Sequence, residues 1–554
     1  MRVSSSPATP PKGTGRHAQR EAAERSAWLP RLMSEARVHR WHIAGALAVC
    51  VLATLIGLLG PAWLAPQNDN FTGPHITAAG PASPPARVCG NRAVLGGGPS
   101  AAPAGAIVVP AGDNASVAWG RPRATYWLAP GTHTLGAGQY AQIIPGRGAT
   151  LVGAPGAVLD GQHLNFYAIG GYAADVTISH LTVRNFGPVG GNNNEGVVNH
   201  NSSAGWTITH STVADNAGAG VMVGSRDTLE WDCLQNNQQY GFNAYAPGPS
   251  GPTNIIISHN EIAGNDTYNW EQHDPGCGCT GGGKFWDVNG AVITSNWVHG
   301  NHSVGLWADS NNRGFAFVGN YIANNFASGL TYEISYNALI KNNTFLRNGL
   351  EEGPKNPGFP TGAIYLSESG SDRRVPGKYG STFAITGNTF TDNWGGVILW
   401  ENSNRFCASP SNTSTGFCTL VNKIITVHSC NPANIAREPY YDDCRWKTQN
   451  VAVDRNVFNF DPARLGKACT AQTDCGYQGV FSEYGTYPSW SPYKGSTVGQ
   501  HITFRQNNHF FDNAYNGPWQ FMAYQQGTTM SWDTWQDAPY NEDRGSTMNP
   551  VAGP

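Results

Sequence analysis

A hydrophobic pattern of the form aliphatic-x-x-Asn-x-aliphatic recurs along most of the chain. Its clearest copies are residues 257–262 (ISHNEI), 293–298 (ITSNWV), 317–322 (FVGNYI), 340–345 (IKNNTF), 385–390 (ITGNTF) and 453–458 (VDRNVF). Weaker copies are residues 178–183, 208–213, 229–234 and 504–509. Asn296, Asn320 and Asn343 follow one another at intervals of 24 and 23 residues, and wider gaps elsewhere fit one coil plus an inserted loop. A fixed period of this kind predicts a solenoid whose repeats stack on their neighbours.

A second apolar run, opening on Gly, usually follows each copy, as in residues 218–223, 305–309, 329–333 and 396–400. Each coil would then supply two or three short strands, with alternate apolar side chains pointing into a narrow core. The Asn at the bend can bond to the backbone of neighbouring coils and form a ladder. We therefore predict an all-β fold, a right-handed parallel β-helix, in which the Asn repeats are structural.

Two other repeat folds fit less well. Leucine-rich repeats share the period, but there Leu dominates and a helical turn completes each unit, whereas β-branched and aromatic residues fill the apolar positions here. A propeller needs longer units. Residues 124–135 and 149–161 have the form of opening coils, so we expect the stack to start near Tyr126.

From Cys89 to about Met548 the chain resembles bacterial secreted right-handed β-helix repeat proteins of the pectin-lyase-like superfamily. These proteins are related in fold to pectate lyases, polygalacturonases and mannuronan epimerases. Residues 283–286, 296–301, 305–309 and 332–336 resemble in particular a subgroup of long actinobacterial members. The resemblance implies the fold and leaves the reaction open, since the polygalacturonase acid motifs and the pectate-lyase calcium triad are not found.

The N-terminal part has a different pattern. Residues 43–60 form an uncharged apolar run long enough to cross a bilayer as a helix, and Arg is frequent before it. We predict a basic, disordered cytoplasmic tail at 1–41, a transmembrane signal anchor at 42–64, a Pro/Ala/Gly-rich linker at 65–88 and the β-helix at 89–548. A cleaved signal peptide is the alternative. The anchored chain would be a single-pass membrane protein with an extracellular β-helix.

Composition agrees with an exported solenoid that has many turns. The chain of 554 residues has 68 Gly, 18 Trp and only 13% charged residues, and its net charge of -3 argues against nucleic acid as a partner. Ten of the eleven Cys follow the apolar run, which suggests disulfides. Short spacings favour the pairs Cys407–Cys418, Cys430–Cys444 and Cys469–Cys475. The alternative is a zinc site of Cys277, Cys279 and His273, which lacks a second ligand pair, so we predict no metal site.

Equivalent positions of successive coils lie about 4.8 Å apart, so they form columns on the outside of a β-helix. Aligning the Gly-opened strands places Asp309 beside Glu333, with Lys284 and Asp287 in the preceding coil. Later members of the column would be Glu368, Glu401 and Glu483. Two carboxylates so placed suit the acid–base or nucleophilic roles of glycoside hydrolysis. The structural alternative is that exposed acids cap turns, pair with Arg or bind calcium.

Aromatic residues in the same strands favour a carbohydrate ligand, because indole and phenol rings stack on the C–H faces of sugars. We predict Asp309, Glu333, Lys284 and His299 as catalytic residues. The predicted substrate-binding residues are Trp307, Trp286, Tyr332, Tyr336, Trp400 and Glu401. The equally open alternatives are a surface Lys, a His bonded in a turn and Trp packed under loops.

The sequence therefore predicts a surface protein that acts on polysaccharide as a lyase or hydrolase. The other hypothesis is a non-catalytic module that binds glycan or cell wall, or projects a rigid rod. No cofactor follows from the sequence, and calcium stays open as a ligand of exposed acids. Oligomeric state is left open.

Overall fold

The computed structural model describes residues 81–246, 251–375, 377, 381–412, 418, 421–422, 424–470 and 473–550. These residues belong to two units. The described part of one unit is Glu271–Gly278, in which the Gly278 N–H donates to the Glu271 carboxylate at 3.2 Å. All the other described residues form the main unit, to which the following description applies.

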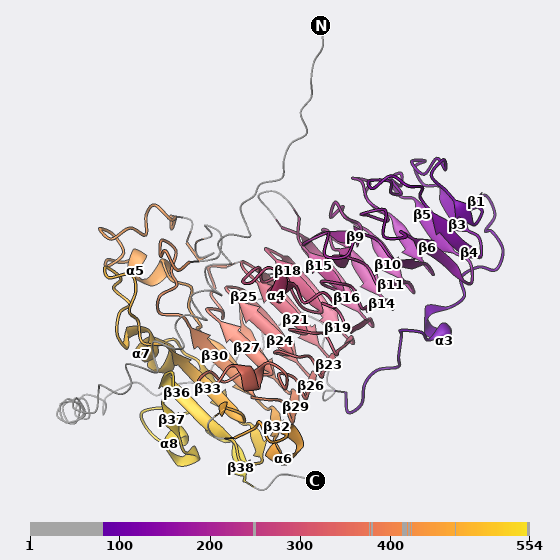
Figure 1. Ribbon diagram of the computed structural model, residues 1–554. Helices are drawn as coiled ribbons and strands as arrows, with labels where there is room; N and C mark the ends of the chain where they lie inside the picture. Colours follow the sequence, from indigo (N-terminus) through magenta and orange to yellow (C-terminus); the bar gives the residue numbers. More distant parts are fainter. Residues whose placement is uncertain are drawn as a thin grey trace. The chain divides into compact units, whose positions relative to one another are not determined.

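The main unit is a parallel β-helix made of three sheets, named A, B and C, and a typical coil contributes one strand to each. Figure 1 follows the stack from β1, in indigo, to β38, in yellow. The prediction of a parallel β-helix is confirmed, with its first strand one coil earlier than the expected start near Tyr126.

The strands of sheet A are β1 (Ile107–Val109), β3 (Thr125–Leu128), β5 (Thr150–Gly153), β7 (Thr177–Ser179), β10 (Thr207–Thr209), β13 (Thr228–Glu230), β16 (Thr253–Ser258), β19 (Asn289–Thr294), β22 (Arg313–Val318), β25 (Tyr336–Lys341), β28 (Phe383–Thr386), β31 (Val451–Asp454) and β34 (His509–Phe511). Those of sheet B are β2 (Gly112–Asp113), β4 (Gly131–Thr134), β6 (Ala157–Asp160), β8 (Thr182–Arg184), β11 (Thr212–Ala214), β14 (Cys233–Gln235), β17 (Glu261–Ala263), β20 (Trp297–His299), β23 (Tyr321–Ala323), β26 (Thr344–Leu346), β29 (Thr389–Thr391), β32 (Val457–Asn459), β35 (Ala514–Asn516) and β38 (Thr547–Asn549). Those of sheet C are β9 (Gly196–Val198), β12 (Ala219–Met222), β15 (Phe242–Ala244), β18 (Gly283–Trp286), β21 (Leu306–Asp309), β24 (Leu330–Glu333), β27 (Ile364–Ser367), β30 (Val397–Glu401), β33 (Tyr477–Ser482), β36 (Gln520–Gln525) and β37 (Thr529–Met530).

The helices are short and lie between strands. They are α3 (Arg92–Leu95), α4 (Trp270–His273), η2 (Gly353–Lys355), α5 (Tyr440–Asp443), α6 (Pro462–Leu465), α7 (Thr497–Phe504) and α8 (Trp532–Gln536).

The predicted membrane anchor requires a correction. The longest helix of the described residues, α7, has eight residues and is therefore about 12 Å long, whereas a bilayer core needs about 30 Å. None of the helices described is both long and apolar enough to cross a membrane. The predicted span at 42–64 lies outside the described residues. Within the described residues the fold is a parallel β-helix without a transmembrane helix, which corrects the predicted fold class, and the predicted single-pass membrane location is contradicted.

Alternation within each strand sends every second side chain into one continuous core. In β21, Leu306 and Ala308 are fully buried in that core, whereas Trp307 and Asp309 point outward. Aromatic side chains also stack in columns inside the helix, as Phe345, Phe390 and Phe458 do at centroid distances of 5.0 and 4.6 Å. The apolar positions of the sequence repeat are therefore the lining of the core.

The predicted Asn ladder is present at the turn between sheets A and B. The Asn320 side-chain N–H donates to Asn343 Oδ1 at 2.9 Å, and the same oxygen accepts from the Asn320 backbone N–H at 2.9 Å. A second ladder runs along the turn between sheets B and C. Its members are Asn216, Asn237, Asn265, Asn301, Asn325, Asn348 and Asn393. Both ladders satisfy buried turn groups that no strand could reach.

Two segments outside the coils pack against the stack. Residues 81–99, which we call the strap, bond to sheet B: the Val88 and Cys89 N–H groups donate to Glu261 Oε2 at 2.7 and 2.8 Å, and Cys89 is joined to Cys233. Residues 402–450, which we call the insertion, connect β30 to β31. The insertion positions the arginines of the site described below.

The expected disulfides are confirmed. Cys407–Cys418, Cys430–Cys444 and Cys469–Cys475 are bonded. Cys277 and Cys279 are also oxidised, so they offer no thiolates to the zinc alternative.

Candidate functional site

The outer face of sheet C brings the predicted site residues of four strands together. In the register of β18 and β21, Lys284 lies beside Trp307 and Trp286 beside Asp309. The register of β21 and β24 pairs Trp307 with Thr331, and its continuation places Glu333 next to Asp309. Glu333 in turn pairs with Ser367 of β27. The predicted Asp309–Glu333 neighbourhood is therefore a real feature of the fold, because it follows from coil stacking alone.

Lys284 and Asp309 form an ion pair between two indole rings. The Lys284 Nζ lies 3.0 Å from Asp309 Oδ2, and the two side chains are only 9% and 13% exposed. The same Nζ lies 4.1 Å from the centroid of the Trp307 ring and 5.8 Å from that of Trp286. Ser310 Oγ donates a further hydrogen bond to Asp309 at 3.0 Å. The ion pair is therefore partly shielded from solvent and lies next to two aromatic rings. Cation–π contacts with these rings hold the Lys284 ammonium in place.

Glu333 is held by donors from two directions. Its carboxylate accepts from Trp307 Nε1 at 3.2 Å and from Arg405 Nη1 at 3.1 Å. Arg405 comes from the insertion, is 2% exposed, and also binds Glu368 at 3.0 Å. Bonds of this kind hold the carboxylate in one position. Beyond Glu333 the column of acids is therefore covered by the insertion, although the sequence predicted it on the outside of the β-helix.

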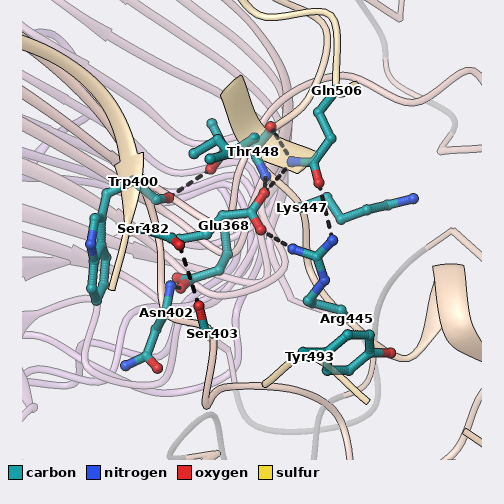
Figure 2. A network of polar contacts seen from close by, with 12 residues as sticks. Glu368, Trp400, Asn402, Ser403, Arg445, Lys447, Thr448, Ser482, Tyr493 and Gln506 are labelled. Carbon is teal, nitrogen blue, oxygen red and sulfur yellow. Dashed lines mark hydrogen bonds and ion pairs between the residues drawn. The ribbon is translucent and has the colours of Figure 1, made fainter. Parts of the chain in front are cut away.

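Glu401 lies at the centre of a buried polar network. Figure 2 labels its partners Arg445, Thr448 and Gln506. Its carboxylate binds Arg445 and the Gln506 side chain, and it accepts from the Thr448 N–H at 2.6 Å. Arg445 also donates to Gln506 Oε1 at 3.0 Å, and its guanidinium lies 5.3 Å from the Tyr493 ring centroid. Burial raises the pKa of Glu401 to about 7, and the nearby Arg445 opposes that rise. Glu401 therefore ties the insertion to the stack and is not open to a ligand.

Three of the predicted aromatic contacts lie in the interior. Tyr332 points into the core of the helix, where it meets Phe383 edge to face at 5.0 Å. Tyr336 is buried in a small cluster with Trp446 and Val375 of the surrounding loops. Trp400 lies under Phe359, whose ring is 5.4 Å away, and is 6% exposed. Of the aromatic set, Trp286 and Trp307 alone keep partly exposed faces on sheet C.

His299 lies on another sheet. It belongs to β20 of sheet B, where its Nε2 is 3.2 Å from Glu261 Oε1, the same carboxylate that receives the strap. The sequence could not separate the two sheets, because His299 is only seven residues from Leu306. The structure places His299 with the strap and not with Asp309.

Arg405 and Arg445 are the polar partners that the sequence reasoning missed. Each stands one or two residues from a cysteine of the insertion, Cys407 and Cys444. The insertion interrupts the coil period, so the spacing of the repeat cannot predict that these arginines lie next to Glu333 and Glu401. The adjacent disulfides were the one available signal that the loop is fixed against the body.

A second polar cluster lies on the first coils of sheet C. The Tyr167 hydroxyl bonds to the Glu195 carboxylate, and its ring stacks on His200 at 3.7 Å. Burial, then the bond to Glu195, raises the pKa of Tyr167, while burial lowers that of His200. Nothing in the Asn-based repeat marks these residues.

The acids of the column have cations as neighbours. Asp309 has Lys284, Glu333 and Glu368 share Arg405, and Glu401 has Arg445. A calcium ion takes about six to eight oxygen ligands. A cation bound to each of these four acids is the opposite arrangement, so these residues are suited to ion pairing.

Comparison with known proteins agrees with the fold. A family model described as "Right handed beta helix region" matches residues 195–377. No curated protein matches the chain.

Among solved structures, the A-modules of two Azotobacter vinelandii mannuronan C-5 epimerases are similar to this chain. The AlgE4 module is 14% identical, with 64% of this chain and 86% of that chain covered and a TM-score of 0.37. The AlgE6 module is 15% identical, with 64% and 83% covered and a TM-score of 0.37. The Agl-KA catalytic domain is 10% identical, with 77% and 62% covered and a TM-score of 0.37. At such values these likenesses carry no information on the activity of this chain.

Proposed function

Because the chain is a right-handed parallel β-helix protein, we propose that it binds a polysaccharide on the outer face of sheet C and acts on it at the Lys284–Asp309 pair. The observation that supports this proposal is the alternation of charge and indole on two adjacent strands. Lys284 and Trp286 stand on β18, and Trp307 and Asp309 on β21, each charge beside an indole of the other strand. Sugars offer both apolar C–H faces and hydroxyl groups, which such a surface matches.

The chemistry assigned to the site follows from its two carboxylates. Asp309 and Glu333 stand on successive coils, whose strands are about 4.8 Å apart, and glycosidases use two acids that flank the scissile bond. Glu333, held in position by Trp307 and Arg405, would stabilise the positive charge that develops on a sugar ring. Asp309 would exchange the proton, with Lys284 balancing its charge. Either hydrolysis or elimination uses a base at this position, and the products distinguish them.

The variants Asp309→Asn and Trp307→Ala test the proposal on a panel of neutral and uronate-containing glycans. We expect Asp309→Asn to lower turnover by at least about 100-fold, the usual effect of losing an acid–base group. Trp307→Ala should weaken glycan binding by about tenfold, through loss of stacking. Reducing ends without unsaturated sugars indicate hydrolysis, and ultraviolet absorbance of unsaturated products indicates elimination.

Asp175→Asn is the matched control, because Asp175 also forms an ion pair, with Arg147 at 3.2 Å, on an exposed surface without indoles. Full turnover in Asp309→Asn would remove this residue from the mechanism. Equal effects of Asp175→Asn and Asp309→Asn would show that both act through stability.

A second function, a non-catalytic glycan-binding module, is favoured by one observation. Three of the outward acids, Glu333, Glu368 and Glu401, are bonded to Arg405 or Arg445 of the insertion. In that case sheet C retains glycan, Trp307→Ala releases it, and no product forms even after long incubation.

The disulfides support a place of action. Cys89–Cys233 joins distant parts of the chain, and three further bridges close loops. Such bonds persist in oxidising compartments. We propose that the β-helix works in one.

A further inference from the structure

A polar cavity of about 450 Å³ opens beside α7, away from the site on sheet C. Its lining consists of Tyr441 from the insertion and Ser496, Thr497, Gln500, His501 and Arg505 from α7 and its ends. Helix α7 packs against β30, β33 and β36 of sheet C. Strand β33 is four strands further along the sheet than β21, so about 19 Å separate the cavity from Asp309 along the stack at about 4.8 Å per coil.

Two lining side chains donate within the protein, Thr497 Oγ1 to Lys494 O at 2.8 Å and Gln500 to the Tyr524 hydroxyl at 3.3 Å, whereas in the described part of the chain the other donors of the cavity are not used in this way. Within the described residues, no carboxylate lies within ion-pair distance of Arg505, and the side chains of Ser496 and His501 make no hydrogen bond. Among the described residues, the acid whose charge acts on His501 is Asp442, which is exposed and lies 3.7 Å from Lys447, and both Asp442 and Glu438 act on Tyr441. The cavity therefore presents a guanidinium, a hydroxyl and an imidazole to whatever enters it.

The electrostatic field in the cavity is positive. Burial, then the neighbouring Arg445 and Arg505, lower the pKa of His501 to about 4, with a smaller contribution of the same sign from Lys447; Asp442 opposes them. Burial is the largest cause, and among the charges the three cations outweigh Asp442 at this imidazole. Burial also raises the pKa of Tyr441, so its hydroxyl stays a donor near neutral pH. This positive charge would attract an anion into the cavity.

A cluster of aromatic side chains lies next to the C-terminal end of α7. Phe504 is 36% exposed, immediately before Arg505. Its ring lies 5.6 Å from that of Tyr540 and 6.1 Å from that of Tyr524. The Tyr524 hydroxyl in turn accepts from the Gln500 side chain at 3.3 Å. These rings do not line the cavity but are joined to its lining through Gln500, and a cation with aromatic rings nearby suits a ring-shaped ligand that carries a negative charge.

We propose that this cavity is a second binding site, which takes an anionic substituent of a glycan, with Arg505 as its main ligand and Phe504 and Tyr540 as the platform for the sugar ring. The planar guanidinium matches carboxylate, sulfate and phosphate oxygens alike. The glycan part of the inference rests on the proposed function, whereas the anion part rests on the cavity itself. The site holds a charged glycan at a distance from the Lys284–Asp309 pair.

Calorimetric titration of the whole chain tests the site with three galactan oligosaccharides of equal length: neutral, sulfated and fully oxidised to the uronate. A glycerol phosphate oligomer serves as the phosphate arm. Arg505→Gln should weaken binding of the preferred charged oligosaccharide by about tenfold or more and leave neutral binding unchanged. Phe504→Ala should weaken charged oligosaccharides by about threefold to tenfold. Arg121→Gln, an equal charge change at an exposed arginine of the first coils, is the control.

The pH dependence gives a readout that a structural role of Arg505 would not change. An anion in the cavity raises the pKa of His501 from about 4, so its binding takes up a proton. Affinity should therefore rise by about threefold to tenfold as the pH falls from 7 to 5. His501→Gln should remove that rise.

The outcomes separate the two proposals. Loss of charged-glycan binding in Arg505→Gln, with Trp307→Ala still binding it, supports the second site. Equal binding by Arg505→Gln and the native chain, or equal affinity for charged and neutral oligosaccharides, overturns it. Loss of turnover in Asp309→Asn while Arg505→Gln binds normally would leave the sheet C proposal intact and refute this one.

Discussion

At the scale of the residue, burial and cations decide what each acid of sheet C can do. Lys284 balances Asp309 where the face is still partly open, whereas Arg445 reaches Glu401 in a fully buried place. Burying a carboxylate without a partner costs several kcal/mol, roughly, so each buried acid needs its cation. The acids thus divide into one partly open pair and a set that holds the insertion down.

Glu401 should give the folded chain a distinct pH response. Its pKa is about 7 in the folded state and near its ordinary 4.5 when unfolded. The folded chain therefore keeps this proton at pH values where the unfolded chain has lost it. Stability should fall as the pH rises from about 4.5 to about 7, by on the order of 3 kcal/mol for this group, and level off above that.

Denaturant unfolding of Glu401→Gln across this pH range measures the effect. The slope of the free energy of unfolding against pH should change by the contribution of about one proton, because the variant has no carboxyl group at this position. Asp227, whose pKa burial also raises to about 7, would keep its own share of the slope. Glu352→Gln, at an exposed ion pair with Lys355, is the control and should change nothing. An unchanged slope in Glu401→Gln would assign the titration to other acids.

A second prediction at the residue scale concerns the contribution of Arg405 to stability. Arg405→Met removes the cation between Glu333 and Glu368 and leaves two buried carboxylates facing each other. We expect a loss of about 3–5 kcal/mol, and a much smaller loss when Glu333→Gln and Glu368→Gln are added. The exposed pair of Arg147 and Asp175 offers the comparison: Arg147→Met should cost less than about 1 kcal/mol. Similar losses for the two arginines would show that the insertion is not held through these charges.

At the scale of the element, the sequence predicts the coils but not the positions of the strap and the insertion, which pack against them. The Asn ladder could be read from spacing, because a stack repeats the same environment once per coil. The second ladder was open to the same reading, since Asn301, Asn325 and Asn348 each follow a first-ladder Asn by five residues. The site could be predicted only in part. The repeat period placed Asp309 beside Glu333, but Arg405 and Arg445 lie in the insertion, which has no repeat period.

The two ladders lead to a prediction for Asn320→Ala. The Asn320 amide donates to Ile293 O and to Asn343 Oδ1, both at 2.9 Å, and its oxygen accepts from Asn296. Removing it leaves buried donors and acceptors of three coils unpaired, which should cost about 2–4 kcal/mol. The midpoint of urea unfolding measures the loss. Asn356→Ala, at an exposed Asn with φ of -120°, serves as the control and should cost less than about 0.5 kcal/mol.

At the scale of the main unit, contacts between neighbours dominate, because each coil touches only the next. The strap is the exception. It bonds to Thr344 of β26 through Pro81, to Glu261 of β17 and to Cys233 of β14, so one segment crosses several coils of sheet B. A tie of this kind couples coils that would otherwise open separately.

The disulfide of the strap should therefore contribute to the stability of many coils, and that of the insertion to a local region. Cys89 and Cys233 are 144 residues apart, against 14 for Cys430 and Cys444. Closing the longer loop restricts the unfolded chain more, so Cys89→Ala with Cys233→Ala should cost about 4–5 kcal/mol. Hydrogen exchange should then speed up in sheet B from β14 to β26.

In Cys430→Ala with Cys444→Ala, faster exchange should stay within the insertion and next to Glu401. Faster exchange confined to residues 81–99 in the first variant would show that the strap covers the stack without coupling its coils.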